Sequence, residues 1–367
     1  MIVVRRIGAS LLAPVAAIGV AMIITSLVIT LSGSAAGDFW SVIFSQPSHR
    51  AIVNIVDQTS LIYISALAAA IGFRMNLFNI GVEGQYTLAS YAAATLAGAA
   101  VFPGLFNVVV PLILAVVVGA AWAGIAGLLK VTRGVSEVIS TIMLNAIAVT
   151  LVGYLLNKYG IHEGNGVRST VIPESSQLEG WQFFGRPDGP VWTLSVLAVL
   201  LGIGFWVLLN KTRFGFDLRA TGMSQSAAVA SGVNVHKMVV ASMLISGGIA
   251  GLIWMPSFFG SAHSYGTAFQ AGLGFTGIAV ALLGRNQPVG IVFGAVLFAF
   301  LNEQSNRLTL ETDISVNVVQ ITQGTIVLTV VVAYEVVRRY RAKLDQRTVA
   351  QRLSAQRAAS EREDAPA

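Results

Sequence analysis

Amides and hydroxyls make up most of the polar side chains that lie within or beside the apolar runs of this 367-residue sequence. Such groups bind neutral solutes by hydrogen bonding, whereas a proton relay through a membrane needs buried Asp, Glu or His. The densest cluster is the segment Gly72–Gln85, GFRMNLFNIGVEGQ, which holds five polar residues and three glycines between two apolar runs. We expect either a loop or a broken helix whose unwound part lines a solute path. The candidate path residues are Phe73, Asn76, Asn79, Glu83, Gln85, Asn145, Asn317 and Gln320.

A second interpretation of these polar residues is that they join helices, because interhelical hydrogen bonds are a regular use of amides in membranes. Asn317 and Gln320 are three residues apart, as are Gln320 and Gln323, so we expect the three on one helix face. An ion pair between Arg74 and Glu83 is compatible with both interpretations. The sequence leaves the choice between path and packing open.

Patterns of catalysis and of metal binding are missing from the sequence. The Walker A pattern, HExxH and GxSxG do not occur, cysteine is absent, and the four histidines are scattered without ligand spacing. We therefore expect no catalytic residue, metal site or cofactor on this chain, and ATP with Mg²⁺ would be bound by a partner ATPase. The net charge of +6 lies mostly in a tail after the last apolar run, so we expect membrane lipid, and no nucleic acid, beside it.

The composition is that of a membrane protein built from helices. Hydrophobic residues make up 55% of the sequence and charged residues only 11%, against about 25% in soluble globular domains. Several apolar runs reach the roughly 20 residues that cross a bilayer as a helix. We therefore predict an all-α, polytopic membrane helix bundle of about ten transmembrane helices, of which the second, eighth and ninth are short. The predicted spans are Leu11–Leu31, Thr59–Phe73, Gln85–Phe102, Val108–Leu129, Val138–Asn157, Val191–Leu209, Met238–Phe258, Gly272–Gly284, Pro288–Leu301 and Val316–Tyr334.

The distribution of charge predicts the orientation of this bundle. With the N-terminus inside, the inner segments hold 18 of the 23 Lys and Arg residues, while acids divide nine outside and eight inside. A bias in Lys and Arg alone is the positive-inside pattern, so we expect both termini in the cytoplasm. The transmembrane domain would cover residues 1–337, with an outer loop at 158–190, before a basic, partly disordered cytoplasmic tail at 338–367. Alternatively, the first run is a cleaved signal peptide ending near Ser34-Ala35-Ala36, although it exceeds the usual apolar stretch of about 7–15 residues.

A polar loop at 210–237 separates two of the apolar runs, and its Lys and Arg residues predict that it faces the cytoplasm. Its centre, Met223–Gly232, is small and uncharged enough to form a short helix, with Thr221 as the cap and Gly232 as the stop. Such a helix suits docking into a separate motor subunit and is too short to be a motor itself. The candidate coupling residues are Arg219, Thr221, Gly222, Ser226, Ala227, Ala228 and Gly232.

Three segments together resemble the permease subunits of bacterial ABC importers for nucleosides. They are GFRMNLFNIGVEGQ at 72–85, SEVISTIMLNAIA at 136–148 and GFDLRATGMSQSAAVASGVNV at 215–235. That group belongs to the wider family of branched-chain amino acid, ribose and simple-sugar permeases, and the resemblance extends over residues 10–335. Ribose-type permeases tend to carry an Asp-Leu-Ser type segment where this chain has Asn79–Glu83, and this difference favours nucleosides.

The resemblance implies a transporter assembled from several chains. A second permease chain, expected to be a paralogue, would share the central path, and an ATP-binding subunit would dock on the loop at 215–235. A solute-binding lipoprotein would deliver solute from outside a bacterial plasma membrane, which this chain would cross many times. No enzyme activity of this chain itself is implied. The alternatives are a simple-sugar permease of the same kind, such as one for ribose, or a secondary transporter that does not use ATP.

Overall fold

The chain divides into two compact units. The structure, a computed structural model, describes residues 19–31, 33, 35–164, 166–312, 317–333, 336 and 339. The larger unit comprises Trp40–Thr312, and the smaller comprises Met1–Phe39 with Asp313–Ala367. The predicted tail at 338–367, apart from Arg339, and the start of the first predicted span lie outside the described residues, as does Ser34 of the alternative cleavage site.

The smaller unit has helices at Gly19–Leu31 and Asn317–Ala333 among its described residues. On the second of these helices, Asn317 and Gln320 are exposed, whereas Gln323 is buried. The expectation that all three share one face is therefore wrong for Gln323. Each step of three residues falls about 60° short of a full turn at 3.6 residues per turn, so two such steps move a side chain well away from the starting face.

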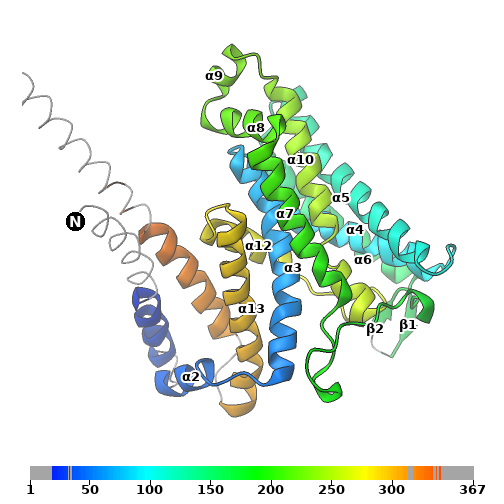
Figure 1. The fold of residues 1–367 in the computed structure, drawn as a ribbon, viewed down its shortest axis with the longest axis vertical. Coiled ribbons are helices and arrows are strands. Elements are labelled where there is room, and N and C mark those ends of the chain that lie inside the picture. The colour runs from blue at the N-terminus through cyan, green and yellow to red at the C-terminus, as the bar shows by residue number, and fades with distance from the viewer. Residues whose placement is uncertain are drawn as a thin grey trace, which may run out of the picture. The chain divides into compact units, whose positions relative to one another are not determined.

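The larger unit is built almost entirely from helices (Figure 1). Its α-helices, the first of which begins just before the unit, are α2 (Ala36–Ile43), α3 (His49–Arg74), α4 (Val82–Gly98), α5 (Phe106–Arg133), α6 (Glu137–Tyr159), α7 (Val196–Lys211), α8 (Arg213–Met223), α9 (Gln225–Ala230), α10 (Val235–Gly251), α11 (Met255–Ser257), α12 (Leu273–Leu283) and α13 (Pro288–Glu311). Shorter turns of helix are η1 (Glu174–Ser176), η2 (Arg186–Asp188), η3 (Thr193–Ser195) and the π-helical η4 (Phe258–Ala262). Two strands, β1 (Ile161–Glu163) and β2 (Gly166–Arg168), pair as an antiparallel hairpin within the predicted outer loop. The prediction of a helical membrane protein is confirmed apart from this hairpin.

Six helices of the described residues are long and apolar enough to cross a membrane. They cover His49–Arg74, Phe106–Arg133, Glu137–Tyr159, Thr193–Lys211, Val235–Ala262 and Pro288–Leu308, and shorter apolar helices lie at Gly19–Leu31, Leu273–Leu283 and Asn317–Ala333. The eighth predicted span coincides with α12, which is short as expected, with 11 residues. The predicted short second and ninth spans are wrong, because they are parts of α3 and α13, with 26 and 24 residues.

Paired polar residues explain why α3 and α13 are longer than their apolar runs. Nδ2 of Asn54 on α3 donates to Oε1 of Glu303 on α13 at 3.0 Å. A polar side chain that finds a partner on a neighbouring helix no longer has to leave the membrane. The apolar run in the sequence therefore marks only the part of each helix that lacks such a partner.

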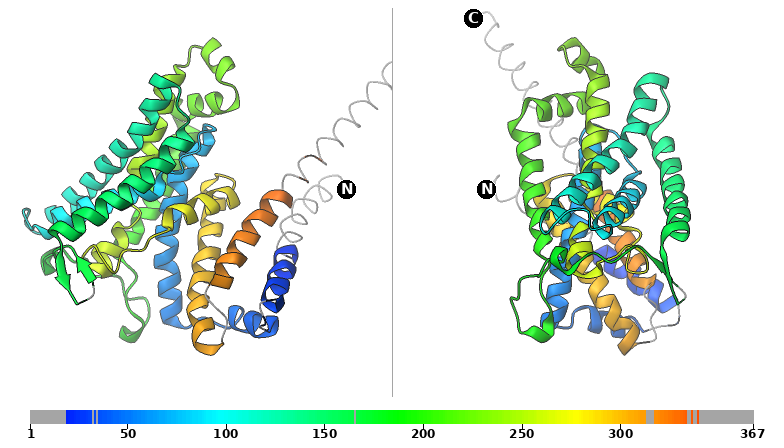
Figure 2. Two further views of the ribbon diagram at one scale, coloured as in Figure 1. Left: turned by 180° about the vertical axis from the view of Figure 1, so that it is seen from behind. Right: turned by 90° about the vertical axis from the view of Figure 1, so that its right-hand side faces the viewer.

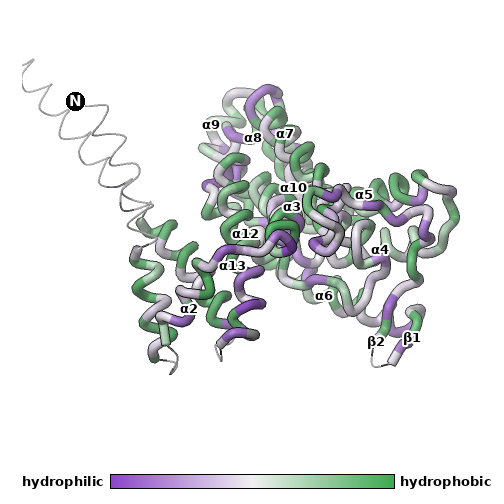
Figure 3. The backbone as a smooth tube through the Cα atoms, turned by 60° about the horizontal axis from the view of Figure 1, so that its bottom comes forward, coloured by the Kyte–Doolittle hydropathy of each residue, from purple (hydrophilic) through white to green (hydrophobic). Residues whose placement is uncertain are grey.

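Helix α3 is the central helix of the larger unit and contacts α7, α10, α12 and α13 (Figures 1 and 2). Of its most apolar stretch, 78% is buried inside the protein, against 28% for α6. Helix α6 instead exposes apolar side chains such as Ile139 and Met143, as a lipid-facing helix does. Apolar residues run along most of each long helix (Figure 3), so it is burial, and not hydropathy, that separates the central helix from the peripheral ones.

Helices α5 and α10 approach each other through glycines. A Cβ atom on Gly119 of α5 would collide with the carbonyl oxygen of Gly247 on α10, and the reverse holds as well. One turn later, a Cβ on Gly251 would collide with the carbonyl oxygen of Ala115. Small residues four apart allow backbones to come this close, which gains van der Waals contact that lipid cannot replace. The Gly247-x-x-x-Gly251 pattern is therefore a packing face.

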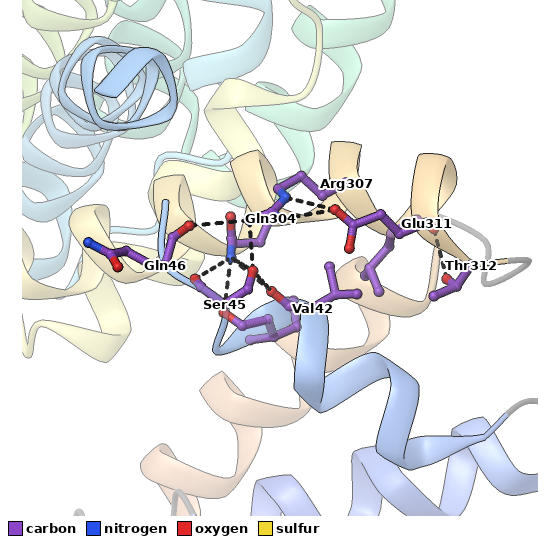
Figure 4. A network of polar contacts seen from close by, with 9 residues as sticks. Val42, Ser45, Gln46, Gln304, Arg307, Glu311 and Thr312 are labelled. Carbon is purple, nitrogen blue, oxygen red and sulfur yellow. Dashed lines mark hydrogen bonds and ion pairs between the residues drawn. The ribbon is translucent and has the colours of Figure 1, made fainter. Parts of the chain in front are cut away.

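One glutamine on α13 holds the end of α2 (Figure 4). Nε2 of Gln304 lies 2.9 Å from the carbonyl oxygen of Val42 and 3.1 Å from that of Ser45. One turn later, Nη1 of Arg307 donates to Oγ of Ser45 at 2.7 Å, and Nη2 binds Glu311 at 2.9 Å. Because the last carbonyls of a helix have no partner within it, these donors from α13 satisfy them and fix the connection from α2 to α3.

Replacing Gln304 by Ala should destabilise the larger unit. The buried carbonyls at the end of α2 would lose their donor, so we expect the free energy of unfolding to fall by about 1–3 kcal/mol. The measurement is the unfolding transition of the purified chain in detergent, followed by tryptophan fluorescence. Glu311→Gln alters an exposed ion pair on the same helix and should change stability by less than about 0.5 kcal/mol. Equal stability of Gln304→Ala and the wild type would contradict the capping role.

Candidate functional site

The connection between α3 and α4 is a tight turn. Helix α3 ends at Arg74, and Leu77 donates its backbone N–H to the carbonyl of Gly72 at 2.9 Å. Asn76 has φ 58°, a left-handed conformation that Asn tolerates better than most residues. Helix α4 then begins at Val82. The glycine-rich polar segment singled out in the sequence is therefore two helix ends joined by a turn, and not an extended loop.

Asn79 and Gln85 form a reciprocal pair of amides at the start of α4. Nδ2 of Asn79 donates to Oε1 of Gln85 at 3.0 Å, and Nε2 of Gln85 donates to Oδ1 of Asn79 at 2.9 Å. Asn79 also accepts from the backbone N–H of Gly81 at 3.0 Å and donates to Oγ of Ser246 on α10 at 2.7 Å. The side chains of this pair are at most 1% exposed. Both donors and both acceptor positions of Asn79 are thus used inside the protein.

Asn145 caps the start of α4 from another helix, α6. Helix α4 follows Gly81, which has no side chain to bind the first N–H groups of the helix. Oδ1 of Asn145 accepts from the N–H of Gly84 at 2.8 Å, and its Nδ2 donates to the carbonyl of Ile80 at 2.8 Å. A tertiary contact therefore replaces the local cap that the sequence lacks.

Glu83 binds the N-terminus of a second short helix, α12. This helix begins at Leu273 after Gly272, which has φ 91° and no side chain to act as a cap. The two carboxylate oxygens of Glu83 accept from the N–H of Gly272 at 2.7 Å and of Gly274 at 2.9 Å. The hydroxyl of Tyr86 lies 3.3 Å from the same carboxylate. A carboxylate is favoured here by two charge-assisted hydrogen bonds and by the positive end of the helix dipole.

The expected ion pair between Arg74 and Glu83 is wrong. No ion pair joins these residues in the described part of the chain, and Nε of Arg74 instead donates to the carbonyl of Asn286 at 2.9 Å. The reason is that Arg74 closes α3 beside the α12–α13 turn, while the Glu83 carboxylate is directed at the opposite end of α12. Backbone N–H groups therefore take the place of the arginine.

The structure brings together four of the predicted path residues. The central junction comprises Asn79, Glu83, Gln85, Asn145 and Ser246, all of them buried. Phe73 is half-buried, with its ring centre 5.3 Å from that of Phe78, and Asn76 is exposed on the turn. The remaining two, Asn317 and Gln320, belong to the smaller unit. The junction amides are hydrogen-bonded within the protein, so the geometry favours the interpretation that they join helices.

Sequence reasoning does not single out Asp57, a buried carboxylate on α3. It is 3% exposed, and its Oδ1 accepts from the N–H of Trp192 at 2.9 Å and from Oγ of Ser195 at 3.1 Å. These bonds hold the start of α7 against α3. The only signal in the sequence is a single acid after the apolar pair Ile55-Val56 and before the polar run 58–60, which also looks like the end of a loop.

The predicted outer loop at 158–190 packs on the segment around η4. Leu178 donates its backbone N–H to the carbonyl of Phe259 at 3.0 Å, and Ile172 donates to that of His263 at 3.0 Å. Ser169 extends this contact with an N–H bond to the carbonyl of Tyr265 at 2.7 Å. The loop is therefore fixed to the body of the larger unit along much of its length.

The short helix predicted within the loop at 210–237 exists as α9, and a second helix, α8, precedes it. The cap of α9 is Ser224, whose Oγ accepts from the N–H of Ala227 at 3.3 Å, and Gly232 follows the helix with φ 82°. Thr221 is not the cap, because α8 continues past it and its hydroxyl donates to the carbonyl of Asp217 at 2.8 Å. The polar loop is thus a pair of helices.

A groove of about 640 Å³ lies between α8, α9 and the start of α10. Phe216 and Met223 line it and are 63% and 84% exposed. Of the predicted coupling residues, Ala227 is exposed and Ala228 is buried. Large apolar side chains exposed beside a groove are typical of a surface that contacts another protein.

Comparison with protein families gives one match over most of the chain. The family described as "Branched-chain amino acid transport system / permease component" matches residues 51–335. The match includes α3, apart from its first two residues, and all later elements to α13, with the central junction and the α8–α9 pair.

Individual relatives are similar over most of their length. The guanosine ABC transporter permease protein NupP of Bacillus subtilis (strain 168) is 33% identical over 348 residues, which are 91% of this chain and 96% of that protein. The nucleoside ABC transporter permease protein NupB of Lactococcus lactis subsp. cremoris (strain MG1363) is 27% identical over 71% of this chain and 74% of its own. The glucose ABC transporter permease protein TsgB13 of Haloferax volcanii is 27% identical over 83% of this chain and 82% of its own.

The substitution Glu83→Gln should weaken the start of α12. An amide retains one oxygen acceptor but turns an NH₂ group toward one of the two glycine N–H donors, so we expect a loss of about 1–3 kcal/mol in the free energy of unfolding. The measurement is denaturant unfolding in detergent together with hydrogen exchange of the Gly272 and Gly274 amides. Glu174→Gln, at an exposed carboxylate, is the control. Unchanged protection of both amides in Glu83→Gln would show that the carboxylate does not cap α12.

Proposed function

This chain belongs to the family of permease components of branched-chain amino acid transport systems, and we propose that it carries nucleosides through a membrane as one subunit of an ATP-driven ABC importer. The observation that carries the choice of solute is its 33% identity to a guanosine permease over nearly the whole of both chains. The family membership also agrees with the three sequence segments that resemble nucleoside permeases.

Simple sugars are the second candidate class of solute. The similarity to a glucose permease over 83% of this chain supports them. Both classes present several hydroxyls and no net charge, so both suit a passage lined by neutral hydrogen-bonding groups. A nucleoside also presents a base, which could stack on an exposed ring such as Phe78, which is 45% exposed.

The remaining parts of the transporter follow from this function. An ATP-binding subunit supplies ATP hydrolysis and Mg²⁺, a second permease chain, expected to be a paralogue, completes the path, and a solute-binding lipoprotein delivers solute from outside. The chain lies in a bacterial plasma membrane with about ten spans and with both termini in the cytoplasm, as the bias of Lys and Arg supports. Of the path candidates in the larger unit, the half-buried Phe73 and the exposed Asn76 then contribute to the passage, while the central junction positions α4 and α12. The exposed Asn317 and Gln320 keep the same proposed role within the smaller unit.

The α8–α9 pair is the coupling element in this proposal. Of the predicted coupling residues, the exposed Ser226, Ala227 and Gly232 contact the ATPase, whereas Arg219, Thr221, Gly222 and Ala228 hold the pair in place from within the chain. A mechanical link from this pair to the membrane helices exists, because a Cβ on Gly222 would collide with the carbonyl oxygen of Arg74 at the end of α3. A shift of α8 therefore reaches α3 directly, and alternation between two packed arrangements switches the side to which the path opens.

Reconstitution tests the function and the solute together. The chain is purified with its ATPase, its second permease and its binding protein, placed in liposomes, and supplied with labelled guanosine, adenosine, uridine or ribose. We expect uptake of nucleosides that requires ATP. Uptake of ribose alone would show that the solute class is simple sugars and not nucleosides. Uptake that persists without ATP but needs an ion gradient would refute the ABC mechanism.

A charge on the exposed face of α9 should uncouple the transporter. Ala227→Asp places a carboxylate at the ATPase contact, and we expect ATP-dependent uptake to fall by about tenfold or more, because an unpaired charge in an interface is costly. Ala227 is the better position than Ala228, which is buried and would disturb packing within the chain. Uptake and ATP hydrolysis are measured in the same liposomes.

The matched control for this variant is Val171→Asp, which puts the same charge on an exposed position of the segment at 158–190. It should retain uptake. Wild-type uptake by a correctly inserted Ala227→Asp protein would refute the coupling role of α9.

A further inference from the structure

Three elements that each carry an arginine meet beside the end of α3. Arg74 is the last residue of α3, Arg219 lies on α8, and Arg285 lies in the α12–α13 turn. Arg219 and Arg285 are charged neighbours of Arg74, and both are positive. The elements touch one another through the Arg74–Asn286 hydrogen bond and the close approach of Gly222 to Arg74. Repulsion among three like charges is relieved when an anion binds between them.

Arg219 has hydrogen-bonding capacity that the protein does not use. Its Nη1 atom is buried and has no hydrogen-bond partner among the described residues. Neither Arg74 nor Arg219 forms an ion pair with a carboxylate in the part of the chain that the structure describes, whereas Arg213 on the same helix as Arg219 pairs with Asp217 at 3.9 Å. A guanidinium group presents its donors in a fork that matches the oxygens of a phosphate. The cluster therefore suits a phosphate group.

An apolar crevice of about 430 Å³ lies between α3, α7 and α13. Tyr63, Gly202 and Val292 line it, one from each helix. Gly202 allows Tyr63 to pack directly against α7, because a Cβ there would collide with the hydroxyl of Tyr63. Its rim includes Val199 and Val289, which are 59% and 68% exposed, on helices that are long and apolar enough to cross a membrane. A crevice with apolar walls and an apolar rim suits a hydrocarbon chain.

The crevice runs along α3 and α7 from the level of Val56 and Ser195, and it reaches the end at which the arginines lie through the start of α13 and the last turns of α7. Pro288 lines the crevice and follows Arg285 by three residues, at the point where α13 begins. Trp206 also lines the crevice, and Nζ of Lys211 lies 5.5 Å from the centre of its ring, which adds a fourth cation at this end. A single molecule with an anionic head and an apolar chain therefore fits both the arginine cluster and the crevice.

We propose that an anionic phospholipid binds here, with its phosphate at Arg74, Arg219 and Arg285 and one acyl chain in the crevice between α3, α7 and α13. The bound lipid holds α8 against the end of α3 and the α12–α13 turn. This goes beyond the choice of solute, since it depends only on the chain lying in a membrane. Because α8 leads into the coupling helix α9, the lipid composition of the membrane sets how firmly that element is held.

Lipid binding to the purified full chain tests the proposal. The chain is kept in an uncharged detergent and titrated with phosphatidylglycerol, with phosphatidylcholine and with inorganic phosphate, and bound molecules are counted by native mass spectrometry. We expect one phosphatidylglycerol to be retained, phosphatidylcholine to bind more weakly, and inorganic phosphate not to displace the lipid. Arg219→Gln and Arg285→Gln should each weaken phosphatidylglycerol about fivefold, the usual effect of one cation near an anionic lipid.

Two further variants test the acyl-chain crevice separately from the phosphate site, and the arginine cluster separately from positive charge elsewhere on the chain. Val292→Trp fills the crevice and should weaken the lipid while leaving the arginines in place. Arg133→Gln removes an exposed cation at the end of α5 and should leave binding unchanged. If Arg219→Gln does not fold, Arg285→Gln and Val292→Trp decide the question. Equal binding of the two lipids, displacement by inorganic phosphate, or wild-type affinity in both of these variants would overturn the proposal.

Discussion

The larger unit depends on satisfying helix N-termini that lie inside the protein. Helices α4 and α12 both begin among buried residues, and the residue before each is a glycine that cannot cap it. The hydrocarbon core of a bilayer holds no water that could bind the first N–H groups of a helix. Asn145 from α6 and Glu83 from α4 supply the missing acceptors. Each short helix is therefore stable only where another helix provides its cap.

This arrangement explains how a rigid core and a movable element coexist in one chain. The amides of the central junction have fixed partners on α4, α6 and α10, so the start of α4 is held firmly. The α8–α9 pair, in contrast, keeps large apolar side chains exposed; it contacts α7 and α10, and Gly222 meets the end of α3. A movement that enters at this contact acts on a helix that itself contacts α7, α10, α12 and α13.

The sequence predicted most of this framework because the relevant signals are local. Apolar runs located the long helices, and the small residues at 223–232 located α9. What could not be predicted depends on tertiary contacts. The cap of α4 comes from Asn145, some sixty residues later, and the partner of Glu83 is a backbone, which leaves no trace in the residue types. Thr221 fails as a cap for a similar reason, since nothing in its neighbourhood marks that α8 continues past it.

The central position of α3 has a consequence for the way the chain is made. Its polar residues are synthesised long before their partners: Asp57 precedes Trp192 by 135 residues, and Asn54 precedes Glu303 by 249. An unpaired Asp at the centre of a membrane helix opposes insertion by about 2.5–3.5 kcal/mol, and Asp57, in the first half of α3, meets part of this cost. The helix around which the others pack therefore enters the membrane as a poor span. Helix α3 becomes a stable span only after α7 and α13 have been synthesised. The peripheral helices are therefore made before the central helix has its polar partners.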